Sequence, residues 1–568
     1  MIPLHVKRKF LSCLLVVCPF GNLLAQLQIT FPTSRLVFQR NNANQGTVSV
    51  TGYCPGNATQ IRAQLTVRQG GAATGWIVLD NAPQTGVFQG AFTGVTGGWY
   101  NLEVKAFSGT TEITSTSMDR IGVGEVFITA GQSNSWGANC YSGQATDDRV
   151  SIINYWTGQA GQFTESALPF TVSHADLSTG INNTGMFPGA YLYVWGALGD
   201  RLINQLGVPV MFYGASYSGT NSKHWVNSAN GIESWGSLSQ NMPYRVLGAT
   251  ILHYLKRTGV RGVLWHQGEG DNYYQSYADY VNNINTVIDK SRQQLGFGNL
   301  SWVVSRVSYI PASLGSEYVN HETDPNIIAA QNTLAGYQNN WPGPATDGMI
   351  YPNYRKQDYY HLHFDADDCP ALINVWSQAL PVSYFTSTQP SLPTRTILLT
   401  TGYVFPFTTS PGQSVQVPYF SRVPTRGNNQ YQVDIMTQAG CYLATLATGT
   451  SNPLSVTLPG WANGRYRFRV RSTSPANTGE LSEPITINGS GSGLPSPLPP
   501  NRLISTRDGF WNDPSVWSCG WLPSLIDTAE LKHSVTVPTG YQAQVGLLQQ
   551  NSGSKLIYQS GGRLRLGN

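Results

Sequence analysis

The arrangement of apolar and polar residues changes along the chain. Between residues 26 and 121, apolar residues alternate with polar ones in short segments, as at Ala63, Leu65 and Val67, and glycine pairs separate these segments. Alternation is typical of strands that bury one face, and several such strands without a helical pattern predict a small β-sandwich. We expect this N-terminal sandwich to serve spacing or packing rather than chemistry.

Between residues 122 and 381, short apolar runs alternate with longer segments in which apolar residues recur about every four positions. This pattern predicts strands followed by helices, and therefore an α/β fold with a mostly parallel sheet covered by helices on both faces. In such sheets the ligand site lies at the carboxyl ends of the strands. The expected strands are 126–130, 208–213, 262–265 and 300–307, and the expected helices are 190–206, 244–257, 275–295 and 369–380.

The remainder of the chain is again rich in alternating segments. Residues 390–488 predict a second sandwich that resembles immunoglobulin or fibronectin modules. Residues 489–500, GSGSGLPSPLPP, predict a linker that is flexible in its glycine-serine half and semi-rigid in its proline half. Residues 501–568 resemble the beginning of a β-solenoid module, because short strands there follow one another and end in GGRLRLGN.

The N-terminus predicts export. Lys7, Arg8 and Lys9 precede an apolar stretch at 10–24, and Ala25 supplies a small residue for cleavage, so residues 1–25 read as a signal peptide. A membrane anchor is the alternative, but the stretch is short and contains proline and glycine. We expect a secreted, cell-surface or periplasmic protein without a membrane span.

Composition narrows the class of protein. Only 11% of residues are charged, the formal net charge is +4, and the chain has 60 glycines, 29 tyrosines and 15 tryptophans. This composition suits an extracellular, β-rich protein that faces sugars. It gives no argument for binding to nucleic acid, because no run of lysine and arginine occurs.

Five cysteines follow the expected signal peptide, so they cannot all pair within one chain. Their wide spacing is not that of a small disulfide-stapled domain. If Cys140 and Cys369 flank the same site, a bridge between them is expected, since each lies a few residues from a candidate catalytic residue. The sequence holds no CxxC motif or histidine cluster, so we expect neither a metal site nor a cofactor.

The first candidate site is residues 124–139, GEVFITAGQSNSWGAN, in which an apolar run ends at Gly131 and Ser133 follows. A hydroxyl at the carboxyl end of a buried strand lies near the ligand crevice and near backbone N–H groups that stabilise an oxyanion. Ser133 is therefore a candidate nucleophile. The alternative is that Ser133 only caps the next helix.

Two later strand ends carry small or polar residues. In 213–225, YGASYSGTNSKHW, the backbone N–H of Gly219 can face a substrate without a side chain in the way, although an ordinary glycine turn is the alternative. In 264–272, LWHQGEGDN, a strand leads directly into polar residues. They are His266, Gln267, Glu269 and Asp271.

A carboxylate near two histidines completes the candidate residues. Asp358 lies three residues before His361 and five before His363. A serine nucleophile requires an imidazole base, and an aspartate that holds this imidazole stabilises its charged form. Lone histidines are mostly structural or surface residues, so the pairing with Asp358 is what favours catalysis.

Together these motifs resemble the SGNH hydrolase superfamily, in particular its sialate O-acetylesterases and related carbohydrate acetylesterases. The resemblance covers residues 122–381. Four blocks in the same order are far more specific than any one of them. They are GQSN at 131–134, G-T-x-x-x-x-W at 219–225, WHQGE at 265–269 and D-x-x-H at 358–361.

The resemblance implies a three-layer α/β/α domain of flavodoxin-like type and hydrolysis of acetyl esters on sugar hydroxyls. Ser133 would be the nucleophile, and its N–H with that of Gly219 would form the oxyanion hole. Gln267 occupies the block in which many SGNH enzymes place an asparagine donor, so its amide is the candidate for a third contact. Glu269 would orient the amide of Gln267.

The identity of the base is where this chain departs from the family pattern. The literal D-x-x-H pair is Asp358 with His361, which we favour because a neighbouring carboxylate usually orients the imidazole. His363 is the alternative base, because the family often continues its histidine as in His363-Phe364-Asp365. In that case Asp358 would reach it from five residues away, or a Ser-His dyad would act.

The sequence therefore predicts a serine acetylesterase that acts on acetylated carbohydrate, with glycan binding through the flanking β domains as a further expectation. Two alternatives remain. One is an acetylxylan-type polysaccharide esterase. The other is an inactive secreted protein that binds carbohydrate or serves in adhesion.

Overall fold

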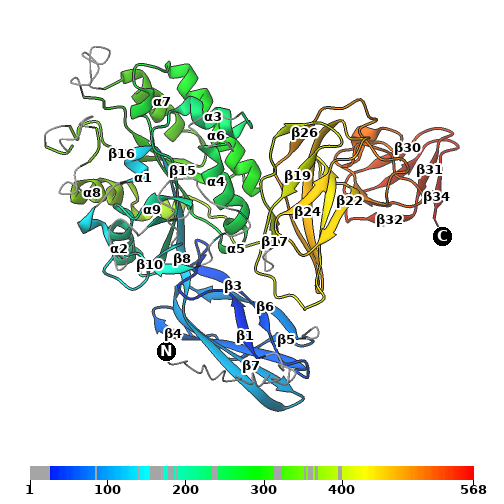
Figure 1. Cartoon of the computed structure of the whole chain (residues 1–568), viewed down its shortest axis with the longest axis horizontal. Helices are drawn as coiled ribbons and strands as arrows, with labels where there is room; N and C mark the ends of the chain where they lie inside the picture. The colour runs from blue at the N-terminus through cyan, green and yellow to red at the C-terminus, as the bar shows by residue number, and fades with distance from the viewer. Residues whose placement is uncertain are drawn as a thin grey trace, which may run out of the picture.

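The computed structural model describes residues 26–567, except 84–85, 138–139, 154–164, 166–167, 169–170, 177–184, 187, 233–240, 312–322, 351–352, 356–361, 365–368 and 395–398. Figure 1 shows an α/β part that packs against N-terminal β-sheets on one side and C-terminal β-rich parts on another. In the described part of the chain, no helix has both the length and the apolar character needed to cross a membrane.

The N-terminal region is built from antiparallel strands. Strands β1 (Gln28–Phe31), β3 (Gln45–Tyr53) and β6 (Val87–Thr96) form one sheet. Facing strands belong to the sheet that continues into the α/β part. They are β2 (Val37–Gln39), β4 (Gln60–Gln69), β5 (Ile77–Asp80), β7 (Gly98–Ser108) and β8 (Thr111–Gly131).

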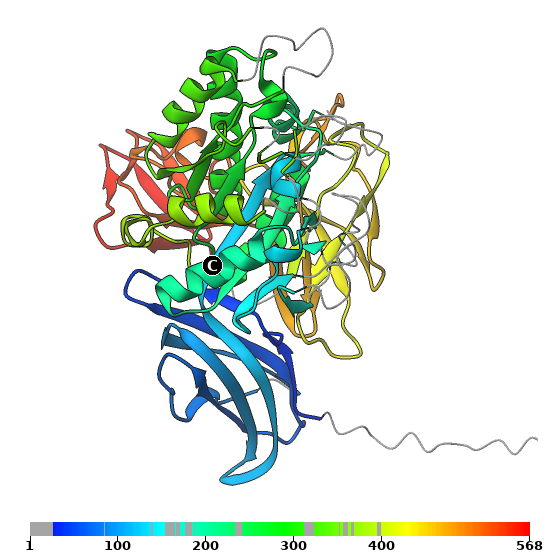
Figure 2. The ribbon, with the colours of Figure 1, turned by 90° about the vertical axis from the view of Figure 1, so that its left-hand side faces the viewer.

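Strand β8 joins the N-terminal region to the α/β part without interruption (Figures 1 and 2). Its first half pairs antiparallel with β7 up to Val123, and its second half pairs parallel with the strands of the α/β part from Glu125. The residues of the first half are exposed or half-buried, whereas the last eleven residues are all buried. The strand expected at 126–130 is therefore the end of a 21-residue strand.

The α/β sheet has β8 near its centre, in the order β10-β9-β13-β8-β14-β15-β16. Strands β13 and β14 pair in parallel with β8 on its two sides, and β15 and β16 extend the parallel sheet beyond β14. Their bounds, with those of the small strands at the sheet edge, are β9 (Val150–Ile153), β10 (Val172–His174), β11 (Gly185–Met186), β12 (Pro188–Tyr191), β13 (Val210–Ser216), β14 (Gly262–His266), β15 (Ser301–Arg306) and β16 (Asn340–Ala345).

Helices bury both faces of this sheet. Val126 and Ile128 belong to one apolar cluster with side chains of α3, α4, α6 and α7, whereas Phe127 belongs to another with α2, α8 and α9. The helices are α1 (Ser133–Trp136), α2 (Trp195–Leu206), α3 (Ser222–Ala229), α4 (Tyr244–Thr250), which continues through a π-helical turn (Ile251–Leu255) into α5 (Lys256–Thr258), α6 (Tyr277–Leu295), α7 (Pro325–Ala335), α8 (Cys369–Ala379) and α9 (Val382–Ser387).

Two expectations for this region need correction. The helix expected over 190–206 begins only at Trp195, because residues 188–191 form β12 beside β13. Helix α7 and strand β16 had no counterpart among the expected elements. Proline lies at the start of α7 and twice within β16, and these prolines obscured both patterns.

The second β-rich region packs its strands around one apolar cluster. It contains an eight-stranded sheet and a two-stranded sheet. The strands are β17 (Leu399–Thr401), β18 (Thr408–Thr409), β19 (Ser414–Val417), β20 (Tyr419–Ser421), β21 (Tyr431–Thr437), β22 (Tyr442–Gly449), β23 (Leu454–Thr457), β24 (Gly464–Thr473), β25 (Ala476–Leu481) and β26 (Ile485–Ile487).

Within the C-terminal part, each strand pairs in parallel with another strand of the same part, which is how the coils of a solenoid stack. A disulfide between Cys441 and Cys519 ties this part to the preceding region. The strands are β27 (Arg502–Ile504), β28 (Gly509–Phe510), β29 (Thr528–Leu531), β30 (Val535–Val537), β31 (Gln542–Val545), β32 (Leu547–Gln550), β33 (Leu556–Tyr558) and β34 (Arg563–Leu566).

Candidate active site

Three strands of the α/β sheet end at the same level and bring three sequence motifs together. Gly131, at the end of β8, pairs with Ser216 of β13 and with His266 of β14. A side chain at Gly131 would lie 2.0 Å from the His266 carbonyl oxygen, and its φ of +139° is one that residues with side chains rarely adopt. Glycine is therefore required where the chain turns from β8 toward Ser133.

Ser133 is the first residue of helix α1 and is half-buried. The first N–H groups of a helix have no acceptor within the helix, so the Ser133 N–H is available to an oxyanion. The preceding residue is fixed, because the Gln132 N–H donates to the His266 carbonyl at 3.1 Å. This is the placement expected for Ser133 from the sequence, at the carboxyl end of a central strand.

The Gln132 side chain binds the turn after β14. Its Oε1 accepts hydrogen bonds from the Gly270 N–H at 3.0 Å, the Gly268 N–H at 3.2 Å and Gln267 Nε2 at 3.2 Å. Gln132 is 3% exposed, so these bonds form away from water. The residue beside the candidate nucleophile thus holds the WHQGE block in place.

Gln267 is buried and fully engaged by the protein. Besides Gln132, its Nε2 donates to the Asp271 carboxylate, and its Oε1 accepts from the Tyr280 hydroxyl at 3.1 Å. Both N–H bonds of the amide therefore have acceptors inside the protein. A role as third oxyanion donor requires one of these acceptors to be exchanged for the substrate.

The segment that contains Gly219 is joined to the same turn. Gly219 lies in the turn after β13 with a φ of +74°, and it is exposed. Thr220 accepts a hydrogen bond from Trp225 Nε1 at 3.0 Å, and the Ser222 N–H donates to the Asp271 carboxylate at 2.9 Å. The G-T-x-x-x-x-W block is thus held by the end of the WHQGE block.

Asp271 is fully buried and joins the turn after β13 to the turn after β14, a connection that we call the junction. Its carboxylate accepts from the backbone and hydroxyl of Ser222 and from Gln267. Burial raises the pKa of Asp271 to about 6, although these hydrogen bonds act in the opposite direction. The negative charge of the junction is therefore sensitive to mildly acidic pH.

Glu269 contacts Asn134 and is also fully buried. Its Oε1 accepts from Asn134 Nδ2 at 2.7 Å and lies 3.6 Å from His266 Nε2 and 3.9 Å from Arg355 Nη1. Burial would raise the pKa of Glu269, but His266, Arg355 and Asn134 outweigh it and hold the pKa below its usual value. Glu269 therefore carries its charge at neutral pH.

Of the candidate base residues, the structure describes His363 but not Asp358 or His361, which lie outside the described residues. The Leu362 carbonyl accepts from Arg355 Nη1 at 2.6 Å and from Asn134 Nδ2 at 3.3 Å. The residue before His363 is thus bonded to the residue after Ser133, and His363 is half-buried.

Arg355 holds the segment that contains Leu362 and His363, and this role was not recognised in the sequence. It is 1% exposed, its guanidinium lies 3.9 Å from the ring centre of Phe364, and its Nε donates to the Met349 carbonyl at 2.7 Å. Asn134 and Gln132 likewise received no role of their own, although they belong to the GQSN block. No spacing pattern marks Arg355, because it lies in an irregular segment.

The expected bridge between Cys140 and Cys369 is present, with a Cα–Cα distance of 6.3 Å. It joins the chain after the GQSN block to the start of α8, shortly after His363. Both cysteines are buried in the cluster that also contains Phe364. The pairing is the one that the sequence suggested for these two cysteines.

The described residues contain no group of three or more His, Cys, Asp or Glu side chains placed to hold a metal ion. The strand ends present a serine at a helix start, an exposed glycine and a histidine-bearing segment. Such groups suit nucleophilic acyl transfer.

Comparison with known proteins finds that part of this region is similar to a family of carbohydrate esterases. Residues 123–335 match the family described as SASA, sialic acid-specific acetylesterase. The match confirms the resemblance to sialate O-acetylesterases that the motifs predicted. No curated protein matches the chain.

Two solved structures show weaker likeness. A carbohydrate acetylesterase from Xanthomonas citri is 14% identical, with a TM-score of 0.43 over 78% of this chain and 94% of that one. A protein from Arabidopsis thaliana is 17% identical, with a TM-score of 0.31 over 46% of this chain and 98% of that one. With TM-scores below 0.5, neither likeness supports a conclusion about this chain.

Proposed function

We propose that this protein is a secreted carbohydrate O-acetylesterase that removes acetyl groups from sugar hydroxyls, with O-acetylated sialic acid as the first candidate substrate. The observation that carries the proposal is the interlocking of the three motif blocks at the ends of β8, β13 and β14. The family match supports the substrate class. The two disulfides support export, because such bonds persist in oxidising compartments.

The proposed reaction proceeds through an acetyl-serine. A histidine takes the Ser133 proton while Oγ attacks the acetyl carbonyl carbon, and the tetrahedral oxyanion is stabilised by the N–H groups of Ser133 and Gly219. The intermediate expels the sugar oxygen, which receives the proton from the histidine. The same histidine then takes a proton from water while the water oxygen attacks the acetyl carbonyl carbon. The bond to Ser133 Oγ breaks, this oxygen receives the proton from the histidine, and acetate leaves.

We assign the base to His363 and keep His361 as the alternative. The bonds of the Leu362 carbonyl to Asn134 and Arg355 support His363, because they fix its backbone beside the residue that follows the nucleophile. Asp358 is the proposed orienting carboxylate for either histidine. Glu269 is proposed to act through Asn134, and a three-layer α/β/α arrangement is supported by the two apolar clusters on the sheet.

The test is acetate release from a small chromogenic acetyl ester by Ser133→Ala, His361→Ala and His363→Ala. Ser133→Ala and the variant of the true base should lose at least about 10⁴-fold in kcat, as in serine hydrolases. The exposed Ser142→Ala and the remote His533→Ala serve as matched controls. The mechanism would be refuted if Ser133→Ala kept full activity, or if neither histidine variant lost kcat to an extent comparable with Ser133→Ala.

Substrate preference is tested next, by comparing kcat/KM on O-acetylated sialic acid with that on acetylated xylan. A preference for the sialic acid would support the proposed substrate, whereas a preference for xylan would favour a polysaccharide esterase. Absence of activity on every ester in the folded, unmutated protein would favour a carbohydrate-binding or adhesion protein.

A further inference from the structure

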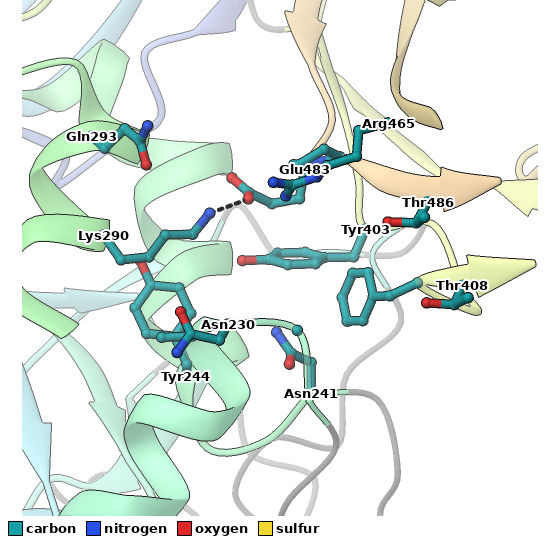
Figure 3. A pocket seen from close by; sticks show the side chains of 14 residues that line it. Asn230, Asn241, Tyr244, Lys290, Gln293, Tyr403, Thr408, Arg465, Glu483 and Thr486 are labelled. Atoms are coloured by element: carbon teal, nitrogen blue, oxygen red, sulfur yellow. Dashed lines mark hydrogen bonds and ion pairs between the residues drawn. The ribbon is translucent and has the colours of Figure 1, made fainter. Parts of the chain in front are cut away.

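The surface of the described chain differs in kind from place to place. A hollow of about 330 Å³ lies between helix α6 and the second β-rich region, and Lys290 Nζ lies 2.5 Å from Glu483 Oε2 in its wall (Figure 3). These two charges satisfy each other, so they are not available to a ligand. The surface at the strand ends is aromatic instead, because Tyr273 and Tyr274 follow the WHQGE block there.

Tyr273 and Tyr274 are the most exposed large aromatic side chains among the residues that the structure describes. They are 58% and 54% exposed, whereas the next two, Tyr558 and Phe510, are 49% and 48% exposed. The ring centres of the two neighbours lie 5.9 Å apart, and the rings meet edge to face at 76°. They therefore form one continuous aromatic surface, which singly scattered apolar residues do not.

The backbone holds Tyr273 in an unfavourable conformation. Its φ is +71°, in the left-handed region that residues with bulky side chains rarely adopt. Such conformations persist only where the surrounding structure enforces them, and they cluster at functional sites. Asn272 Nδ2 donates to the Ser308 carbonyl at 2.5 Å. The Tyr273 N–H donates to Asp324 Oδ2 at 3.2 Å, so the backbone that carries the ring is fixed on both sides.

The loop that carries the two tyrosines lies against both parts of the proposed oxyanion hole. The Gly270 N–H donates to Gln132 Oε1 at 3.0 Å, and Gln132 directly precedes the proposed nucleophile. A side chain at Gly270 would lie 2.7 Å from the carbonyl oxygen of Thr220, the residue after Gly219. Tyr273 comes three residues after Gly270, so the Cα atoms of these two residues lie within about 11 Å of each other. The aromatic surface thus borders the place where the acetyl group would react.

A sugar unit has the chemistry that suits this surface. A pyranose ring presents a face of C–H groups that packs on an aromatic ring, while its hydroxyls stay in water. The acetylated sugar itself must lie at the strand ends, because its acetyl carbonyl has to reach Ser133. The unit that would cover the tyrosines is therefore the next one along a glycan.

We propose that Tyr273 and Tyr274 form a subsite for the sugar unit that is joined to the acetylated one. The inference rests on the proposed esterase function and narrows its substrate to acetyl groups carried by oligosaccharide or polysaccharide chains. The two tyrosines determine specificity and take no part in the chemical step.

Initial rates of acetate release from three esters test the proposal. Nitrophenyl acetate has no sugar, the methyl glycoside of O-acetylated sialic acid has one unit, and O-acetylated sialyllactose carries the same unit in a chain. Acetylated methyl xyloside and acetylated xylotriose are the corresponding pair if the protein prefers xylan. We expect kcat/KM for the chain to exceed that for the single unit by at least about tenfold, because contacts with the second unit contribute to transition-state binding.

Removing the rings should remove this advantage. Tyr273→Gly, which suits the φ of +71°, and Tyr274→Ala should each lower kcat/KM on the chain about tenfold relative to kcat/KM on nitrophenyl acetate. Tyr273→Phe and Tyr274→Phe keep the rings and should keep most of the advantage. Tyr337→Ala is the matched control, because Tyr337 is 39% exposed and lies between α7 and the start of β16, at the opposite edge of the sheet. Its ratio should equal that of the unmutated protein.

Equal kcat/KM for the chain and the single unit, or an unchanged ratio in both variants that lack a ring, would overturn the proposal. Phe variants that lose as much as the variants without a ring would also overturn it, because the contact would then belong to the hydroxyl. Failure of the esterase has a different signature. The unmutated protein would then release acetate from none of these esters, and both proposals would fall together.

Discussion

Arg355 offers a direct test of how the histidine-bearing segment is held. Replacement by Met keeps much of the side-chain length but removes the cation near Glu269 and the hydrogen bonds to the Leu362 and Met349 carbonyls. Removing one partner of a buried charge pair costs about 3 to 5 kcal/mol, and we expect Arg355→Met to lower the free energy of unfolding by about that amount.

Activity should fall as well, because the Leu362 carbonyl would lose its shorter bond and His363 its fixed backbone. We expect kcat for acetate release to fall by about 10- to 100-fold, the effect of a small misplacement of a catalytic group. Urea unfolding and initial-rate kinetics measure the two effects. Arg355→Lys, which keeps a charge but not the planar fork, should lie between Met and the unmutated protein.

A double variant separates charge from packing. If the unpaired Glu269 carboxylate causes most of the loss, adding Glu269→Gln to Arg355→Met should recover part of the unfolding free energy. The loss should also shrink with falling pH, because Arg355 is one of the groups that hold the Glu269 pKa below its usual value. The stability that this lowered pKa contributes at neutral pH disappears from the unmutated protein as Glu269 becomes protonated. A stable, fully active Arg355→Met protein would refute this reasoning.

Three further predictions concern the strand-end site. Gly219→Ala should lower stability by about 1 kcal/mol and reduce kcat, because alanine resists a φ of +74°; unfolding curves and kinetics measure both effects. Cys140→Ser with Cys369→Ser should cost about 2 to 5 kcal/mol and reduce kcat, whereas the double serine variant of the C-terminal disulfide should keep kcat. Because burial raises the Asp271 pKa to about 6, its contribution to stability falls as pH rises from about 4 to 6; urea midpoints measured against pH should show this fall, and Asp271→Asn should abolish it.

The parts of the fold that the sequence predicted are those with strong local patterns. The end of β8 and the helix at 369–379 follow from apolar runs and periodic apolar residues, and the GQSN and WHQGE blocks follow from polar residues at strand ends. The motif order identified the family because each block is short and contiguous in the sequence.

Features that depend on distant contacts were not predictable. The contact of Arg355 with Glu269 joins residues 86 positions apart, and no periodicity marks either partner. The change of pattern near residue 122 predicted a domain boundary, yet β8 continues through it, since only the burial of its faces changes there. Contacts between regions, such as Lys256 with Glu480, are likewise invisible in a local pattern.

The unbroken course of β8 has a consequence for how this protein is divided in evolution. Its first half is paired within the N-terminal sheets, and its last residue leads directly to the turn that carries Ser133, the proposed nucleophile. A gene fusion that replaced the N-terminal region at residue 122 would remove β7, and Gly122 and Val123 of β8 would lose the strand with which they pair. We expect natural rearrangements to transfer residues 26–381 as one unit, and to exchange freely only the C-terminal parts beyond it.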